Sequence, residues 1–271
     1  MNAQTMIKIT PLEFDNFKSL IYEAAGISLT QSKQILITSR LHNRLTHYKL
    51  SSFSQYYALI TDGQHPQELQ HAIDLLTTNE TYFFREMKHF DLLRDRILPE
   101  HGKQRFRLWS AACSTGEEPY SLAMVLADRL GHSPWDIDCT DISSRVLDHA
   151  KMGVYPIQAK EKIPPEYLVK YCLKGTGDKK GTLLIDRRLR QRVHFSQLNL
   201  NGIWPAREPY HVIVLRNVLI YFDAPTKKKL IRRLTQQLHP DGYLIVGHSE
   251  SLTSMNDQLT TVQPSVYRKK H

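Results

Sequence analysis

The spacing of apolar residues changes a little after the first quarter of the chain. Up to about residue 76, apolar side chains recur every three or four residues, the spacing of one face of an α-helix. The first predicted helix begins at Thr10, which has capping-box spacing with Glu13, and Pro11 fits its first turn. It ends just before Gly26. Its apolar face is expected at Leu12, Phe17, Leu20 and Ile21.

Three more helices are predicted over residues 31–49, 52–60 and 66–76. On the first of these, a basic stripe runs beside the apolar one. This stripe is either a solvated helix face or a docking surface for an acidic helix. We therefore predict an all-helical N-terminal domain over residues 1–75. The basic stripe consists of Lys33, Arg40, Arg44 and His47.

From Phe106 onward the pattern alternates between short apolar runs and amphipathic segments. Helices are expected to begin near Gly116, Ser143 and Asp223, and the last should end before Pro240. Alternating strands and helices predict an α/β domain over residues 76–271 with a doubly wound, mostly parallel sheet. The strands are expected at 106–112, 137–141, 193–199, 212–215 and 243–247.

The alternation breaks between about residues 154 and 193. Pro156, Pro164 and the glycine-containing run 175–181 punctuate short segments here. Two short strands around a glycine-rich turn predict a small antiparallel β-subdomain inserted in the α/β domain. Residues 265–271 are expected to add a closing strand and a basic tail.

Composition predicts a soluble, cytoplasmic protein. No apolar run approaches the roughly 18 residues of a membrane span, and the N-terminus lacks signal-peptide features. Cys113, Cys139 and Cys172 show neither metal-ligand nor disulfide spacing, which suits a reducing cytoplasm. The net charge of +9 suits nucleic acid, an anionic membrane surface or an acidic protein, and does not choose among them.

Small residues fill a predicted strand-to-helix turn between Trp109 and Tyr120. Such a turn presents backbone N–H groups to a ligand, and Gly116 can adopt a conformation that other residues resist. The turn has one glycine and two carboxylates, Glu117 and Glu118, where a phosphate would have to bind. A nucleoside ligand without phosphates is therefore the better hypothesis.

Further polar residues are expected at the same edge of the sheet. Asp141 ends a predicted strand, where a carboxylate either binds both ribose hydroxyls or caps the next helix. Glu118 suits an amino group or a sulfonium, but the sequence does not say whether it or Glu117 points inward. The other candidates are Asn79, Thr81 and Arg85 near the domain boundary, and Arg216, Asn217 and Tyr221 after a later strand.

Five motifs taken together resemble the chemotaxis receptor methyltransferases, the CheR family. In chain order these are TTNETYFFRE, WSAACSTGEEPYSLAM, TDIS, LRNVLIYFD and DGYLIVGHSESL. The resemblance implies a Rossmann-like methyltransferase sheet, S-adenosylmethionine as methyl donor with S-adenosylhomocysteine as product, and no metal. It implies glutamate side chains of chemoreceptor helices as acceptors, with no nucleic-acid partner and no membrane insertion.

The resemblance also implies roles for individual residues. Arg85, Arg216 and Tyr221 would act on the reacting groups, and the basic stripe would dock receptor helices. Lys179 and Lys180, in the β-subdomain loop, would help to bind a receptor's C-terminal pentapeptide, as in some family members. The donor site would consist of Asn79, Thr81, Arg85, Glu118, Asp141, Asn199, Leu200, Leu215, Arg216 and Asn217.

Two other functions compete with this prediction. A nucleic-acid methyltransferase would fit the basic charge, but the chain lacks an Asn/Asp-Pro-Pro-aromatic run and a Pro-Cys nucleophile. A non-catalytic scaffold would bind the donor without transferring a methyl group.

Overall fold

The computed structural model describes residues 7–102, 104–253 and 255–270. The chain divides into two compact units. The helical unit comprises Met1–Thr78 with the return segment Tyr221–Thr226, and the α/β unit comprises Asn79–Ile220 with Lys227–His271. None of the helices within the described ranges combines the length and the apolar character needed to cross a membrane.

The helical unit forms where the hydrophobic spacing predicts it. Thr10 and Glu13 make the expected capping box, and Gly26 ends the first helix in a left-handed conformation. Leu12 was wrongly assigned to the buried face: it is 74% exposed, and Phe14 takes its place in the core. The helices are α1 (Pro11–Ala25), α2 (Gln34–His47), α3 (Phe53–Thr61) and α4 (Pro66–Leu76).

A buried carboxylate links the helices of this unit. Glu68 on α4 accepts two hydrogen bonds from Arg44 on α2, at 2.8 and 2.6 Å, and others from Tyr48 and Tyr56. Burial alone would raise the pKa of Glu68, but these hydrogen bonds and the Arg44 charge hold it below the usual value. The ionised carboxylate therefore stabilises the packing of α2, α3 and α4.

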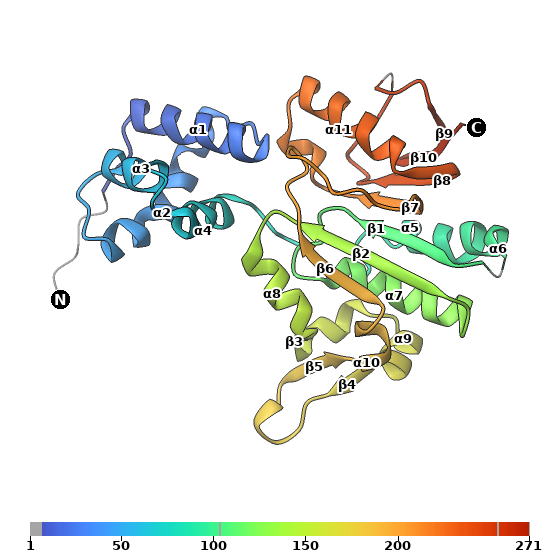
Figure 1. The fold of residues 1–271 in the computed structure, drawn as a ribbon. Helices are drawn as coiled ribbons and strands as arrows, with labels where there is room; N and C mark the ends of the chain where they lie inside the picture. Colours follow the sequence, from blue (N-terminus) through green and yellow to red (C-terminus); the bar gives the residue numbers. More distant parts are fainter. Residues whose placement is uncertain (1–6, 103, 254, 271) are drawn as a thin grey trace. The chain divides into compact units, whose positions relative to one another are not determined.

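The α/β unit is built on a mixed, mostly parallel sheet (Figure 1). Within the described residues its strand order is β6-β2-β1-β7-β8-β10-β9, with β10 antiparallel to both of its neighbours. The parallel strands bear out the doubly wound prediction. They are β1 (Phe106–Ser110), β2 (Trp135–Asp141), β6 (Val193–Gln197), β7 (Tyr210–Leu215) and β8 (Leu238–Val246), followed by β9 (Leu259–Gln263) and β10 (Val266–Lys269).

The connecting helices flank this sheet, and α7 and α8 pack against β2 and β6. The segment before β1 also folds as a helix, which the hydrophobic pattern did not predict; a π-helical turn at Leu93–Ile97 interrupts its periodicity. The helices are α5 (Lys88–Leu92), α6 (Leu98–His101), α7 (Glu117–Leu130), α8 (Ser144–Met152), α9 (Pro165–Tyr171), α10 (Arg187–Arg190) and α11 (Ala224–Gln236).

The predicted β-subdomain is present as a second sheet with order β3-β5-β4, all antiparallel. It lies beyond α8 in the lower part of Figure 1. Its strands are β3 (Val154–Pro156), β4 (Cys172–Lys174) and β5 (Thr182–Ile185).

Pro240 lies inside β8, which begins before the Pro240-Asp241-Gly242 run that was expected to precede the strand. The pairing of β7 with β8 shifts register between Tyr210 and Val212, and Asp241 has a positive φ of 62°. A local irregularity of this kind accommodates a proline that a regular central strand would exclude.

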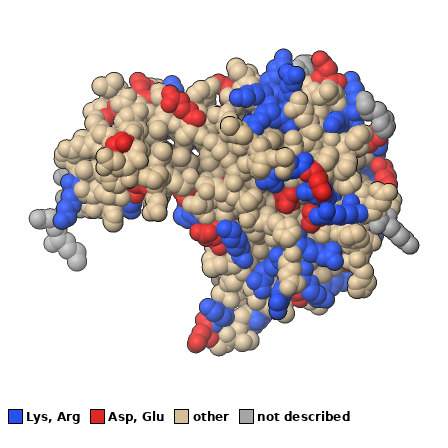
Figure 2. Space-filling model, viewed as in Figure 1, with Lys and Arg blue, Asp and Glu red and all other residues tan. Residues whose placement is uncertain are grey.

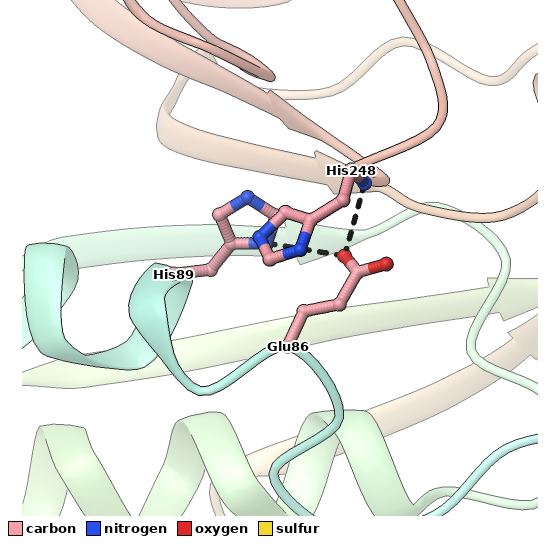
Figure 3. Close-up of side chains that lie close together, drawn as sticks. All are labelled: Glu86, His89 and His248. Atoms are coloured by element: carbon pink, nitrogen blue, oxygen red, sulfur yellow. Dashed lines mark hydrogen bonds and ion pairs between the residues drawn. The ribbon is translucent and has the colours of Figure 1, made fainter.

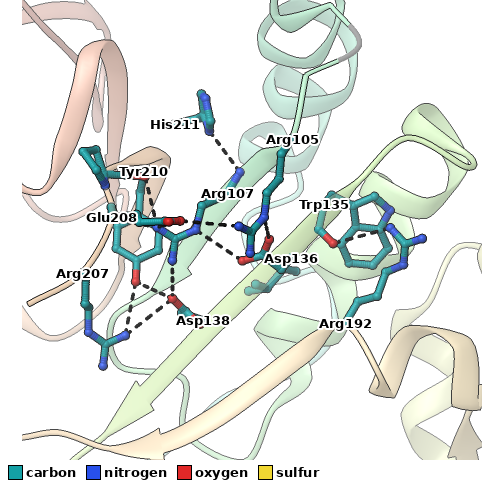
Figure 4. Close-up of polar contacts among 12 residues, drawn as sticks. Arg105, Arg107, Trp135, Asp136, Asp138, Arg192, Arg207, Glu208, Tyr210 and His211 are labelled. Carbon is teal, nitrogen blue, oxygen red and sulfur yellow. Dashed lines mark hydrogen bonds and ion pairs between the residues drawn. The ribbon is translucent and has the colours of Figure 1, made fainter.

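A polar network lies on part of one sheet face. Residues 198–209 connect β6 to β7 without a helix. The register pairs Arg107 of β1 with Asp136 of β2, and Arg107 also pairs with Asp138. Tyr210 donates its hydroxyl to Asp138 (Figure 4). Arg107 and Asp136 are 11% and 12% exposed, so the ion pairs are largely buried.

We predict that Glu68→Gln destabilises the protein by about 3 kcal/mol, because it leaves the Arg44 charge without a buried partner. Since the folded pKa of Glu68 is lowered, its stabilisation is full above the unfolded carboxyl pKa of about 4.3 and is lost as pH falls. Urea unfolding between pH 3 and 7 measures both effects. The exposed Glu23→Gln is the control, and equal stability of the two variants would contradict this account.

Candidate functional site

The turn between β1 and α7 requires glycine at position 116. Gly116 has a φ of 97°. A Cβ there would lie 2.7 Å from the hydroxyl of Tyr155 and 2.9 Å from the Cβ of Ala150, which are closer than real contacts. The sequence-predicted bend is therefore fixed by both conformation and space.

Asp141 holds this turn from the end of β2. Its Oδ2 accepts the N–H of Ser114 at 2.9 Å, and its Oδ1 accepts the N–H of Ser143 at 3.0 Å. On the other side, Ser114 Oγ donates to the carbonyl of Asn79 at 2.8 Å. The structure therefore brings Asp141, Asn79 and the turn together at the carboxyl edge of the sheet. Asp141 thus bonds to Ser143, the residue directly before α8, as well as to the turn.

The two carboxylates of the turn have different surroundings. Glu118 accepts from Ser110 Oγ at 2.7 Å and from Arg216 at 2.9 Å. Glu117 instead accepts from Thr115 Oγ1 at 2.6 Å. Burial raises the pKa of Glu117 although this hydrogen bond opposes the rise. Glu118 is thus the carboxylate that joins the charged centre of the site.

Arg216 is the centre of that charged group. Its side chain is 2% exposed, and it pairs with Glu118 and with Glu86 at 3.1 Å. It also donates to the carbonyl of Arg85. Burial alone would raise the pKa of Glu86, but the charge of Arg216 and hydrogen bonds from neighbouring groups hold it below the usual value. We call Glu86, Arg216 and Glu118 the Arg216 triad.

Strained backbone surrounds the triad. Positive φ angles occur at Phe84, Glu86, Ser114 and Asn217, with values of 54°, 58°, 47° and 59°. Such conformations cost of the order of 1 kcal/mol each and persist only where the surroundings enforce them. Asn217, for example, is held by the Glu250 carboxylate, which accepts its N–H at 2.9 Å. Strain at four nearby positions is typical of a functional site.

The end of β6 reaches the same edge, because the N–H of Leu198 donates to the carbonyl of Asp141 at 2.9 Å. Asn199 and Leu200 follow directly. Arg233 of α11 donates to the carbonyl of Leu200 at 2.8 Å and lies 3.8 Å over the Trp204 ring. This loop is therefore held from the body of the α/β unit.

Not every predicted residue joins these contacts. Arg85 contributes its carbonyl, while its guanidinium donates to the carbonyl of Glu80 at 2.9 Å. Thr81 is half-buried, and Leu215 is buried at the end of β7 beside Arg216. Tyr221 belongs to the return segment of the helical unit, where its carbonyl accepts the N–H of Ser28. The roles of Arg85, Thr81 and Tyr221 stay predictions.

Sequence reasoning missed Glu86 and Glu250. Both stand inside motifs that were singled out, TTNETYFFRE and DGYLIVGHSESL. In both motifs a carboxylate follows an aromatic or apolar run and is not part of a predicted amphipathic helix. That position was the available signal. Only the fold shows that Glu86 meets Arg216, 130 residues away.

The two predicted partner surfaces differ in how many of their basic side chains already have partners within the protein. Lys33, in the 3-10 turn directly before α2, and His47, at the end of α2, are exposed. Arg44 is paired with Glu68, and Arg40 donates to the carbonyls of Leu76 and Thr77. The basic stripe is therefore partly used inside the helical unit. In the β-subdomain, Lys179 and Lys180 are exposed.

Two family models show which class of protein the chain belongs to. The family model described as "CheR methyltransferase, SAM binding domain" matches residues 79–268, and "CheR methyltransferase, all-alpha domain" matches residues 12–77. The α/β unit is thus a methyltransferase domain that binds S-adenosylmethionine. The chain belongs to the CheR methyltransferase family.

Curated relatives agree over almost the whole chain. A "Chemotaxis protein methyltransferase" of Escherichia coli is 39% identical over 264 residues, covering 96% of this chain and 92% of that protein. "Chemotaxis protein methyltransferase 2" of Pseudomonas aeruginosa is 40% identical, covering 94% and 92%. Among solved structures, the N-methyltransferase NodS of Bradyrhizobium japonicum with S-adenosylhomocysteine is 15% identical over 76% of this chain and 98% of that one. Its TM-score of 0.41 is too low to add to the assignment.

We predict that Glu118→Gln weakens S-adenosylmethionine binding at least tenfold, about 1.4 kcal/mol, because it removes a negative charge of the Arg216 triad. S-adenosylhomocysteine lacks the sulfonium charge and should lose less affinity. Isothermal titration of both ligands measures the difference. Glu117→Gln, one residue away but outside the triad, is the matched control. Equal losses for both variants would contradict the assignment.

Proposed function

We propose that this protein transfers the methyl group of S-adenosylmethionine to glutamate side chains of chemoreceptors, forming glutamate methyl esters. The observation that carries the proposal is family membership across both units, together with relatives that are named chemotaxis protein methyltransferases. Receptor helices that carry the acceptor glutamates are the proposed partners, and adaptation in chemotaxis is the proposed process.

The charge of the triad suits this donor. Two carboxylates and one guanidinium give the Arg216 triad a net charge of −1 when all three are ionised. S-adenosylmethionine has a net charge of +1, from its sulfonium, ammonium and carboxylate groups. S-adenosylhomocysteine has lost the sulfonium charge and is neutral overall. The site is therefore expected to bind donor more tightly than product, which favours product release.

The reaction needs no general base. A receptor glutamate has a reference pKa of about 4.3 and is ionised near neutral pH. One of its oxygens attacks the methyl carbon while the carbon–sulfur bond breaks, and the electron pair stays on sulfur. The two opposite charges cancel, giving an ester and S-adenosylhomocysteine. Catalysis then depends on aligning the oxygen behind the methyl group and excluding water.

The proposed role of each predicted catalytic residue depends on whether its side chain is already hydrogen-bonded within the protein. Every guanidinium nitrogen of Arg216 has a protein partner, so we assign it to positioning Glu118 and the Arg85 backbone. Arg85 and Tyr221 are proposed to face the reacting carboxylates. Asn79, Thr81, Asp141, Asn199, Leu200, Leu215 and Asn217 are proposed to complete the donor site with Glu118.

Docking of receptor helices is proposed to use the remaining positive charge of the basic stripe. Lys33 and His47 are its exposed members, while Arg40 and Arg44 also support the fold. In the α/β unit, Lys and Arg side chains gather over α11 on the viewed face (Figure 2). Positive charge suits an acidic helical substrate.

The deciding experiment incubates the protein with methyl-labelled donor and a cytoplasmic receptor fragment. Base-labile label on glutamate is the expected result, and it should disappear when the fragment's glutamates are replaced by alanine. Donor binding without any transfer would favour a donor-sensing scaffold. Label that appears only on RNA or DNA would favour a nucleic-acid methyltransferase.

A second contact is proposed at the β-subdomain. β4 is an edge strand of the small sheet, and its Leu173 is 53% exposed. An extended receptor pentapeptide with acidic and aromatic residues would pair with this edge, while Lys179 and Lys180 attract its carboxylates. This arrangement would tether the enzyme to its substrate.

We predict that Lys179→Glu with Lys180→Glu weakens pentapeptide binding at least fivefold in calorimetry, without changing donor affinity. Lys151→Glu on α8, exposed in the same unit, is the control. Since the interaction is electrostatic, the difference should shrink at high salt. Peptide binding that is unaffected by the double substitution would remove these lysines from the contact.

A further inference from the structure

Glu86, a member of the Arg216 triad, lies close to His89 and His248, so that three metal-ligand atoms come together (Figure 3). Glu86 lies in the loop before α5, His89 on α5, and His248 just after β8. One ligand atom from each lies within 4.8 Å of the other two. The group therefore joins segments that are distant in sequence.

His89 is buried but unsatisfied. It is 4% exposed, and neither ring nitrogen has a hydrogen-bond partner among the described residues. Its Nδ1 lies 3.5 Å from Glu86 Oε2, and its ring meets the His248 ring edge to face at 4.7 Å. Leaving a buried polar group without a partner costs about 1–3 kcal/mol. A ligand that binds an imidazole nitrogen of His89 would recover this free energy.

Two imidazoles and one carboxylate are a ligand set that Zn²⁺ and similar divalent ions prefer. His248 is exposed, so an ion has access to the group, and solvent can supply a fourth ligand. Tetrahedral coordination needs ligand atoms about 3.3 Å apart. The observed separations must therefore shorten, which rotation of the exposed His248 can achieve. Mg²⁺ and Ca²⁺ prefer oxygen ligands and do not fit this set.

We propose that Glu86, His89 and His248 form a binding site for a zinc-like divalent transition-metal ion, and that the bound ion inhibits the enzyme. Glu86 cannot give its Oε2 fully to both the ion and Arg216, which lies 3.1 Å away. Metal binding therefore weakens the Arg216 triad and adds two positive charges next to a donor with net charge +1. The ion is a regulator and takes no part in methyl transfer.

The first test measures metal binding alone, on the full chain without an affinity tag. Co²⁺ is the probe, because its visible absorption reports tetrahedral nitrogen and oxygen ligands, and Zn²⁺ titration gives the affinity. His248→Gln removes the exposed ligand and should weaken Zn²⁺ binding at least tenfold. His132→Gln, an exposed histidine of the same unit, should bind like the wild type. Equal binding by His248→Gln and wild type would overturn the proposal.

The second test concerns inhibition and rests on the proposed donor site. Stoichiometric Zn²⁺ should lower S-adenosylmethionine affinity at least fivefold in the wild type and in His132→Gln, but not in His248→Gln. Zn²⁺ binding that leaves donor affinity unchanged would overturn the inhibitory part. Because the Co²⁺ spectrum needs neither donor nor acceptor, failure of the metal site is distinguishable from failure of the proposed function.

Discussion

The functional site depends on the ion pairs and hydrogen bonds of the buried Arg216 side chain. A guanidinium that is almost fully removed from water is tolerable only with charged and hydrogen-bonding partners on all sides. Glu86, Glu118 and the Arg85 carbonyl provide them. These partners come from the loop before α5 and the first turn of α7, while Arg216 follows β7. One side chain therefore fixes three segments of the α/β unit relative to one another.

The need to hold partners around Arg216 explains much of the backbone strain near it. Glu86, which pairs with Arg216, and Asn217, which directly follows Arg216, both have positive φ. Glu250 compensates at Asn217 by accepting its N–H. On the other side of the site, Gly116 allows the turn that carries Glu118 to pack closely against Tyr155. The ion pairs and the strained backbone thus support one arrangement, which suits a cationic nucleoside.

Local rules predicted the features that short segments decide. The capping box at Thr10, the end of α1 at Gly26 and the bend at Gly116 all depend on neighbouring residues, and the structure confirms them. The burial of Leu12, the start of β8 and the helix containing α5 were wrong or missed. Each depends on tertiary packing: the orientation of a first turn, a register shift beside Pro240, and a π-helical interruption. Glu86 was missed for the same reason, since its partner is distant in sequence.

The most direct measurement of the account is donor binding by Arg216→Lys. Lysine keeps the positive charge, but a single ammonium cannot reach both carboxylates and the Arg85 carbonyl in the planar arrangement of a guanidinium. If the triad organises the site, the variant should stay folded by circular dichroism and bind S-adenosylmethionine at least tenfold more weakly in calorimetry. Wild-type donor affinity in a folded Arg216→Lys protein would contradict the central role of this side chain.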